Sequence, residues 1–247
     1  MNLSLAWFAA AWFLLSVAQP AAPNVPILLR QFETTYHASK TMRASFLERY
    51  LDNGKEVRSE AGVAYFGRPG KMRWEYVSPE VNLYVVDGKW AWFYVPADHT
   101  VTRIRARQSS DVRAPLALLA GEMKVSRICK SVDPDVVSQP SDPRGVVLRC
   151  ILRGSEDGSN ARANRRDREA SAENNYVLFE LNPANGELFR VLVADPGGVR
   201  IEFRFTNWEF GPRIEDSMFH FQAPQGVAIV DGDLGGAGDA SGAKQTP

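Results

Sequence analysis

The chain of 247 residues is poor in the side chains that hydrolytic enzymes use for catalysis. It has 3 histidines, at His37, His99 and His220, and 2 cysteines. Hydrolysis needs an activated nucleophile with its base, a pair of carboxylates in a cleft or a metal cluster. Neither an H-E-x-x-H nor a G-x-S-x-G motif occurs. We therefore expect a protein that is not an enzyme and that needs no cofactor and no metal.

The chain also lacks an excess of charge of either sign. Its 29 lysines and arginines are balanced by 29 aspartates and glutamates. Binding to a nucleic-acid backbone or to an anionic membrane depends on an excess of positive charge. The composition therefore gives no reason to expect either as the main partner, and we expect no nucleic-acid partner.

An apolar run of the ~20 residues that a membrane-spanning helix needs is missing. The uncharged run at residues 3–17 has instead the length of the apolar part of a secretory signal peptide. Ser16 and Ala18 supply the small side chains of a cleavage site. We predict a signal peptide at residues 1–18 and one exported domain at residues 19–231, with an uncleaved anchor helix as the alternative.

The cysteines, Cys129 and Cys150, have no further histidine or cysteine nearby with which to bind zinc. In an exported protein such a pair favours a disulfide, because the compartment is oxidising. We predict a disulfide between them; two separate buried thiols are the alternative.

The pattern of apolar residues changes period once near the start of the predicted domain. From residue 26 to about residue 40, apolar side chains recur every three or four residues, which predicts one amphipathic helix. From Met42 onward the period is two, and the turn formers at residues 52–54 follow. A β-hairpin therefore follows the helix.

Short alternating segments with turn formers between them continue along most of the chain. Their spacing of about ten residues favours an antiparallel meander, because parallel neighbours would need crossover helices. We predict one short apolar helix at residues 114–121, between strands. The further strands are expected at residues 62–66, 72–76, 83–86, 91–95, 101–106, 126–131, 145–152, 176–181, 188–194, 199–208 and 219–221.

Two stretches have no apolar period. Residues 154–174 are rich in serine, asparagine and charged residues, so we predict a solvated loop there. Residues 232–247 are mostly glycine, alanine, serine and aspartate, so we predict a disordered tail.

Aromatic residues are concentrated in the predicted strands. Two interpretations stay open: a well-packed sandwich or barrel core, or a sheet face that lines a cavity for an elongated apolar ligand. The residues are Tyr65, Trp74, Tyr76, Tyr84, Trp90, Trp92, Tyr94, Phe203, Phe205 and Trp208.

Residues 62–76 read GVAYFGRPGKMRWEY and residues 83–96 read LYVVDGKWAWFYVP. Together they resemble the LolA family of outer-membrane lipoprotein carriers. Two further pieces resemble the same family: M-x-A-x-F at residues 42–46, and F-x-F-x-x-P-x-G-V at residues 219–227. The resemblance covers residues 26–231. The disulfide pair, the polar loop and the tail depart from it, which leaves the range of cargo open.

The resemblance implies a mainly β fold: an incomplete antiparallel β-barrel, or highly curved sheet, covered by a lid of short α-helices. It implies a periplasmic chaperone that carries lipoproteins from the inner to the outer membrane as a monomer. Its expected partners are acylated lipoproteins, an inner-membrane ABC-type lipoprotein-releasing transporter and an outer-membrane lipoprotein receptor. A periplasmic glycolipid carrier or an envelope-stress sensor with the same fold is the alternative.

For the site, the resemblance implies that Arg68, in the R-P turn, hydrogen-bonds to the lid and keeps an empty cavity closed. Arginine suits this role because its fixed donors can satisfy several carbonyl groups while it stays charged. From strand facing and helix apolarity we expect the cavity to be lined by Phe46, Trp74, Tyr76, Trp92, Leu116 and Leu119.

Overall fold

The computed structural model describes residues 23–106, 119–121, 124–153, 176–194 and 199–232. The predicted signal peptide, the predicted loop at 154–174 and the predicted tail lie outside these residues, apart from Gly232. The greater part of the predicted helix at 114–121 lies outside them as well.

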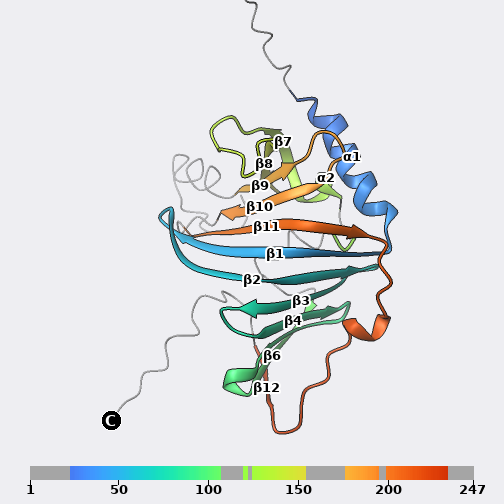
Figure 1. Cartoon of the computed structure of the whole chain (residues 1–247), viewed down its shortest axis with the longest axis vertical. Coiled ribbons are helices and arrows are strands. Elements are labelled where there is room, and N and C mark those ends of the chain that lie inside the picture. The colour runs from blue at the N-terminus through green and yellow to red at the C-terminus, as the bar shows by residue number, and fades with distance from the viewer. Residues whose placement is uncertain (1–22, 107–118, 122–123, 154–175, 195–198, 233–247) are drawn as a thin grey trace, which may run out of the picture.

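The described residues form one open, curved sheet of 12 strands in the order β12-β6-β5-β4-β3-β2-β1-β11-β10-β9-β8-β7, with few helices (Figure 1). The mainly β fold class expected from the sequence is confirmed. Within the described part of the chain, no helix has the length and apolarity to cross a membrane. The strands are β1 (Thr41–Asp52), β2 (Lys55–Gly67), β3 (Lys71–Ser78), β4 (Asn82–Asp87), β5 (Trp90–Val95), β6 (Thr100–Arg105), β7 (Cys129–Pro134), β8 (Val146–Leu152), β9 (Tyr176–Leu181), β10 (Leu188–Ala194), β11 (Val199–Phe210) and β12 (Ala228–Asp231). The helices are α1 (Val25–Ala38), α2 (Val125–Ile128) and the 3₁₀ turns η1 (Pro96–Asp98) and η4 (Asp216–Phe219).

The sheet consists of two antiparallel meanders, β1–β6 and β7–β11, rather than the single meander expected. They are joined where β1 pairs with β11, with Phe46 opposite Phe205. Hairpin connections explain the order within each meander, since each strand lies beside its neighbour in sequence. The contact between meanders joins strands far apart in the chain.

The last strand differs from the sequence prediction. The expected strand at residues 219–221 is not formed: residues 216–219 make the η4 turn instead. The final strand is β12, which pairs with β6 in parallel, Ile229 opposite Val101. A parallel pair needs a long connection between its strands, and the chain between β6 and β12 is long enough to supply it.

The region around the first cysteine also differs from its prediction. Residues 125–128 form the single turn α2, and the strand β7 begins only at Cys129. Strand β8 lies antiparallel to β7, and the structure joins Cys129 to Cys150 with a Cα–Cα distance of 5.4 Å. The disulfide therefore fastens the outermost strand β7 to the rest of the sheet.

The helix α1 begins as the sequence predicts. The Asn24 side chain accepts a hydrogen bond from the Ile27 amide at 3.2 Å, and a proline lies in the first turn. The helix buries Leu28, Phe32 and Tyr36, which lie on one face at helical spacing. This face of α1 packs on the aromatic side of the sheet near β9 and β11, as the ring contacts Phe32–Phe179 and Tyr36–Trp208 indicate.

The two faces of the sheet differ in chemistry because side chains alternate along each strand. We call the face that α1 covers the core face; Phe46, Trp74 and Phe203 belong to it. The opposite face, called the outer face, carries buried charged residues on β9–β11, among them Glu180 and Glu202.

The hydroxyl group of Tyr36 fixes α1 to the sheet. It accepts a hydrogen bond from the backbone amide of Leu188 at 2.9 Å, and the Leu188 carbonyl accepts one from the Trp208 indole at 2.8 Å. Both backbone groups of Leu188 are thus satisfied by side chains of the core face. Burial raises the pKa of Tyr36 well above its ordinary value, so the hydroxyl stays neutral.

We predict that Tyr36→Phe lowers the free energy of unfolding by about 1–3 kcal/mol, because it leaves the buried Leu188 amide without its acceptor. Chemical denaturation of the variant measures this. The matched control is Tyr94→Phe, at a half-buried tyrosine of the outer face. Equal effects of the two substitutions would contradict the role assigned to the Tyr36 hydroxyl.

Candidate functional site

A cluster of aromatic rings occupies the middle of the core face, centred on Trp74. The Trp74 ring lies 4.7 Å from the Phe46 ring, 5.8 Å from Phe66, 5.5 Å from Phe203 and 6.0 Å from Phe205, centroid to centroid. The planes are steeply inclined, which is a favoured geometry for aromatic pairs. Trp74 is fully buried. This part of the core face is therefore a packed aromatic surface.

Strand register explains why these rings meet. Trp74 on β3 is opposite Ala64 on β2, and Phe46 on β1 is opposite Phe205 on β11. The small Ala64 side chain leaves room for the rings on either side of it. Phe46, Trp74 and Tyr76, which the sequence predicts to line the cavity, are all buried in this one cluster.

A buried carboxylate lies beside this aromatic cluster. The Glu48 side chain is fully buried, and its two oxygens accept hydrogen bonds from the hydroxyl groups of Tyr50 and Tyr76, each at 2.7 Å. Charged groups are buried at a cost unless they are hydrogen-bonded. Glu48 was not among the site residues expected from the sequence, although the two-residue alternation after Met42 places it on the core face.

Arg68 joins three separate segments at the edge of the core face. Its guanidinium donates a hydrogen bond to the Tyr36 carbonyl at 2.8 Å and lies 3.2 Å from His37 Nδ1. Its backbone amide donates to the Lys40 carbonyl at 3.0 Å. The carbonyl groups at the end of a helix have no partner within the helix, so Arg68 satisfies one of those of α1.

The third segment that Arg68 contacts is a turn at residues 119–121, the end of the predicted lid helix. A Cβ atom built on Gly121 would lie 2.5 Å from the Arg68 guanidinium carbon. The neighbouring Ala120 carbonyl accepts a hydrogen bond from the Gly70 amide at 3.3 Å. Leu119 is buried, with 1 % of its surface exposed, whereas Leu116 lies outside the described residues.

The electrostatics favour the contact between Arg68 and His37. Burial lowers the pKa of His37, and the nearby Arg68 charge lowers it further. The imidazole is therefore neutral at neutral pH, and Nδ1 can accept a hydrogen bond from the guanidinium. Burial also lowers the pKa of Arg68, but a guanidinium stays protonated at any physiological pH.

The prediction that Trp92 lines the same cavity is wrong. Its neighbours Ala91 and Phe93 point to the core face, so alternation directs Trp92 to the outer face. There its indole donates a hydrogen bond to Asp87 at 3.1 Å, and its ring lies 5.4 Å from that of Phe221. Trp92 was expected in the cavity from strand facing, and the pairing of β5 with β4, in which Trp92 is opposite Val85, reverses that facing.

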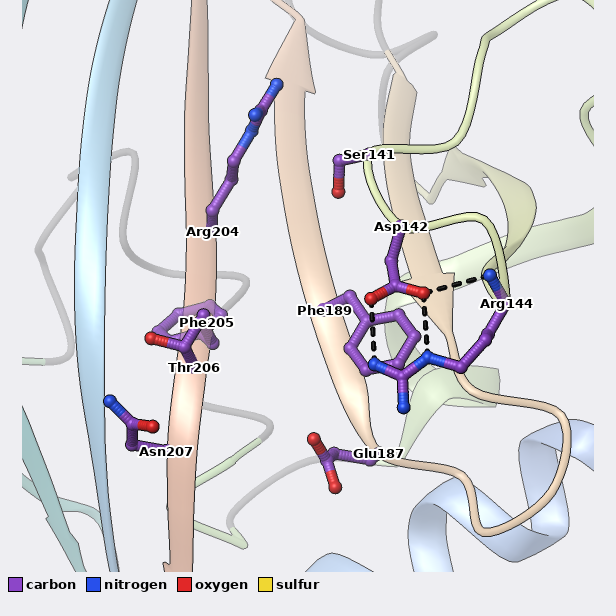
Figure 2. Close-up of a pocket in the computed structure, with 9 residues that line it drawn as sticks. All are labelled: Ser141, Asp142, Arg144, Glu187, Phe189, Arg204, Phe205, Thr206 and Asn207. Carbon is purple, nitrogen blue, oxygen red and sulfur yellow. Dashed lines mark hydrogen bonds and ion pairs between the residues drawn. The ribbon is translucent and has the colours of Figure 1, made fainter.

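The outer face carries a small polar pocket of about 350 Å³ over β10 and β11 (Figure 2). Arg144 holds the pKa of Asp142 down at about 2, through side-chain and then backbone hydrogen bonds. Both residues are already paired with each other, as the dashed lines in Figure 2 show. The pocket is lined by Ser141, Asp142, Arg144, Glu187, Phe189, Arg204, Phe205, Thr206 and Asn207.

Beneath this pocket lies a network of buried charges. The Glu180 carboxylate accepts hydrogen bonds from the amides of Ser141 and Asp142, each at 2.8 Å, and pairs with Arg190 at 2.8 Å. Arg190 also pairs with Glu202 at 3.2 Å. This network of charges holds the loop after β7, which contains Ser141 and Asp142, against the outer face. Its role is therefore structural. Among the described residues, no group of three histidine, cysteine or acidic side chains could hold a metal ion.

The fold and site together define a protein with an open curved sheet, one apolar aromatic face and a charged opposite face. A model of the family "Outer membrane lipoprotein carrier protein LolA" matches residues 37–137. The chain is thus similar to the LolA family, and the resemblance seen in the sequence motifs is confirmed.

Curated relatives match over nearly their full length. Proteins named "Outer-membrane lipoprotein carrier protein" from Chromobacterium violaceum and Nitrosomonas europaea are each 28% identical, covering 86% and 87% of this chain and 92% and 95% of their own. Among solved structures, a LolA superfamily protein from Nitrosomonas europaea is 10% identical with a TM-score of 0.39, covering 81% of this chain and 99% of its own.

We predict that Gly121→Ala disturbs the Arg68 contact. The added Cβ meets the guanidinium, and φ at Gly121 is +83°, which disfavours any other residue. The matched control is Gly88→Ala, where φ is +91° but nothing lies within 4 Å of the added atom. Both substitutions cost about 1–2 kcal/mol of unfolding free energy for the backbone alone. A cost at Gly121 no greater than that at Gly88 would contradict the contact.

The outer-face network predicts a dependence of stability on pH. Burial alone would raise the pKa of Glu202, but hydrogen bonds and charges from Arg49, Arg204 and Arg190 lower it overall. A carboxylate whose pKa falls on folding adds stability above its unfolded pKa of about 4.3 and loses it as the pH drops through the folded value.

We therefore predict that Glu202→Gln lowers the unfolding free energy at pH 7 by about 3 kcal/mol, because three arginines lose a buried partner. The loss relative to the wild type shrinks below about pH 4. Denaturation from pH 3 to pH 7 measures this, with Glu209→Gln, in an exposed ion pair with Arg43, as the control. A difference between Glu202→Gln and wild type that stays constant across this range would rule out the assigned ion pairs.

Proposed function

We propose that the exported domain is a periplasmic carrier that binds the acyl chains of lipoproteins on the core face of the sheet. The observation that best supports this function is the aromatic core face, which is closed at one edge by the contacts of Arg68 with α1 and with Gly121. The names of the relatives and the match to the LolA family support the same role. The function is binding and transport, without catalysis.

The energetics explain why such a carrier needs a closed empty state. Burying an acyl chain gives about 0.8 kcal/mol per CH₂, so a fully bound chain would be released very slowly. Opening the empty site breaks the hydrogen bonds of Arg68, at about 1 kcal/mol each. This cost offsets part of the binding energy. It brings uptake and release closer to balance without any nucleotide bound to the carrier.

The proposal includes the partners that the resemblance implies. An inner-membrane ABC-type transporter loads the monomeric carrier with an acylated lipoprotein, and an outer-membrane lipoprotein receptor accepts it. The signal peptide at residues 1–18 delivers the carrier to the periplasm. The chain itself then moves cargo between the membranes through water, with the acyl chains shielded on the core face.

The direct test is to incubate the mature protein with membranes that contain an acylated lipoprotein and an active releasing transporter. A soluble one-to-one complex that passes its lipoprotein to receptor-bearing vesicles is the expected result. Material that co-purifies with the protein is identified by mass spectrometry. Recovery of a glycolipid in place of lipoproteins, with no soluble complex formed, would overturn the proposal in favour of the glycolipid carrier.

We predict that Arg68→Leu forms the soluble complex but delivers at least tenfold less cargo to the receptor vesicles. The variant loses the hydrogen bond to the Tyr36 carbonyl, so the empty state no longer competes with the loaded one. The control is Arg43→Leu, at a half-exposed arginine of the outer face that pairs with Glu209. Normal delivery by Arg68→Leu removes the role assigned to Arg68 and leaves the carrier function in place.

A further inference from the structure

The indole N–H of Trp74 lacks a hydrogen-bond partner within the described part of the chain, although the residue is fully buried. Buried donors are nearly always paired, because an unpaired one loses its hydrogen bonds to water without replacement. This donor lies in the middle of the core face. It is therefore a candidate contact for a bound molecule.

Two other tryptophans of the sheet have a hydrogen-bond acceptor for their indole N–H. The Trp92 indole donates to Asp87 at 3.1 Å, and the Trp208 indole donates to the Leu188 carbonyl at 2.8 Å. Trp208 belongs to the same face as Trp74 and contacts Phe66 and Phe205. Among the tryptophans that the structure describes, Trp74 is the one with a buried indole N–H that has no partner.

The surroundings of Trp74 make a bound water a poor partner. Four aromatic rings lie between 4.7 and 6.0 Å from its own. A buried water needs several polar partners, which phenyl rings do not supply. The buried carboxylate of Glu48 already accepts hydrogen bonds from Tyr50 and Tyr76. The acceptor that would suit Trp74 has to arrive with an apolar ligand.

An ester-linked acyl chain has the required chemistry. Its hydrocarbon part fits the phenylalanine rings, and its carbonyl oxygen accepts one hydrogen bond. An ester carries no donor of its own, so it leaves no new unsatisfied group among the rings. An amide would bring an additional N–H that the phenylalanine rings could not satisfy.

We propose that the Trp74 indole N–H donates a hydrogen bond to an ester carbonyl of the bound acyl group. The inference rests on the proposed carrier function, because it places the acyl chains on the core face. The inference goes beyond the carrier function because it names a hydrogen-bond donor that distinguishes an ester from plain hydrocarbon. Trp74 then sets the depth at which the first carbonyl of the chain lies.

The test compares two synthetic lipopeptides that carry two chains of equal length on a glyceryl group, one with ester and one with ether linkages. The ether form lacks the carbonyl acceptors and keeps the hydrocarbon. We expect the wild-type protein to bind the ester form about five- to tenfold more tightly, as a single recovered hydrogen bond implies. Displacement of a fluorescent fatty acid measures both dissociation constants.

In Trp74→Phe the preference for the ester disappears, while the ether form binds as it does to wild type. The matched control is Trp208→Phe, which removes an indole N–H that already has a protein acceptor and retains the preference. In the wild-type protein, the Trp74 indole proton resonance, assigned by its loss in Trp74→Phe, moves downfield with the ester form and not with the ether form.

The outcomes separate the two proposals. Equal binding of both forms by wild type, or a preference that survives in Trp74→Phe, overturns the role of Trp74 and leaves the carrier function standing. If no indole proton resonance of the wild-type protein moves downfield with the ester form, the role of Trp74 is overturned too; this outcome needs no assignment and holds even where the variant does not fold. Failure of both lipopeptides to bind overturns the carrier function and this inference together.

Discussion

The pairing of β1 with β11 is the interaction on which the rest of the structure depends. It joins two meanders into one sheet through strands that lie far apart in the chain. Phe46 comes opposite Phe205 in this pair, and both rings contact Trp74. Each meander alone would carry part of the aromatic surface and leave it exposed. The shared register therefore creates the core face, on which we propose that an apolar ligand binds.

The outer face explains why one end of the sheet can serve as a rigid support. Every residue of β9 is buried, because the core lies on one side and the loop after β7 covers the other. Glu180 and Arg190 fasten that loop, and the disulfide fastens β7. A buried ion pair adds little net stability compared with apolar side chains, but it fixes the position of its partners. The helix α1 packs on this supported end.

Local patterns in the sequence predicted most helices and strands. They did not predict which strands pair when the two are far apart in the chain. The helix at residues 26–40 and the first hairpin follow from apolar periods within a few residues. The strand β12 was missed because its pairing with β6 depends on a contact across more than a hundred residues, and its side chains are exposed. Trp92 was placed on the wrong side because the facing of a strand depends on its pairing with β4, which the sequence does not show. Glu48 was passed over because a carboxylate on the core face contradicts the usual pattern, and one of the two hydroxyl groups that bind it, that of Tyr76, is distant in the sequence.

In the proposed carrier, Arg68 and Trp74 have opposite effects on the balance between the empty and the loaded protein. The hydrogen bond from Arg68 to the Tyr36 carbonyl is formed in the structure, and in the proposed function it favours the closed state. The Trp74 donor is unsatisfied there, and in our proposal it gains a partner when an ester arrives. A carrier must neither retain its cargo nor lose it to water. The free energy of hydrocarbon burial grows with chain length and cannot by itself supply such a balance. One polar contact in the empty state and one in the loaded state can supply it. The two residues lie in the same short motif, so the turn after β2 and the strand that follows it carry both contributions.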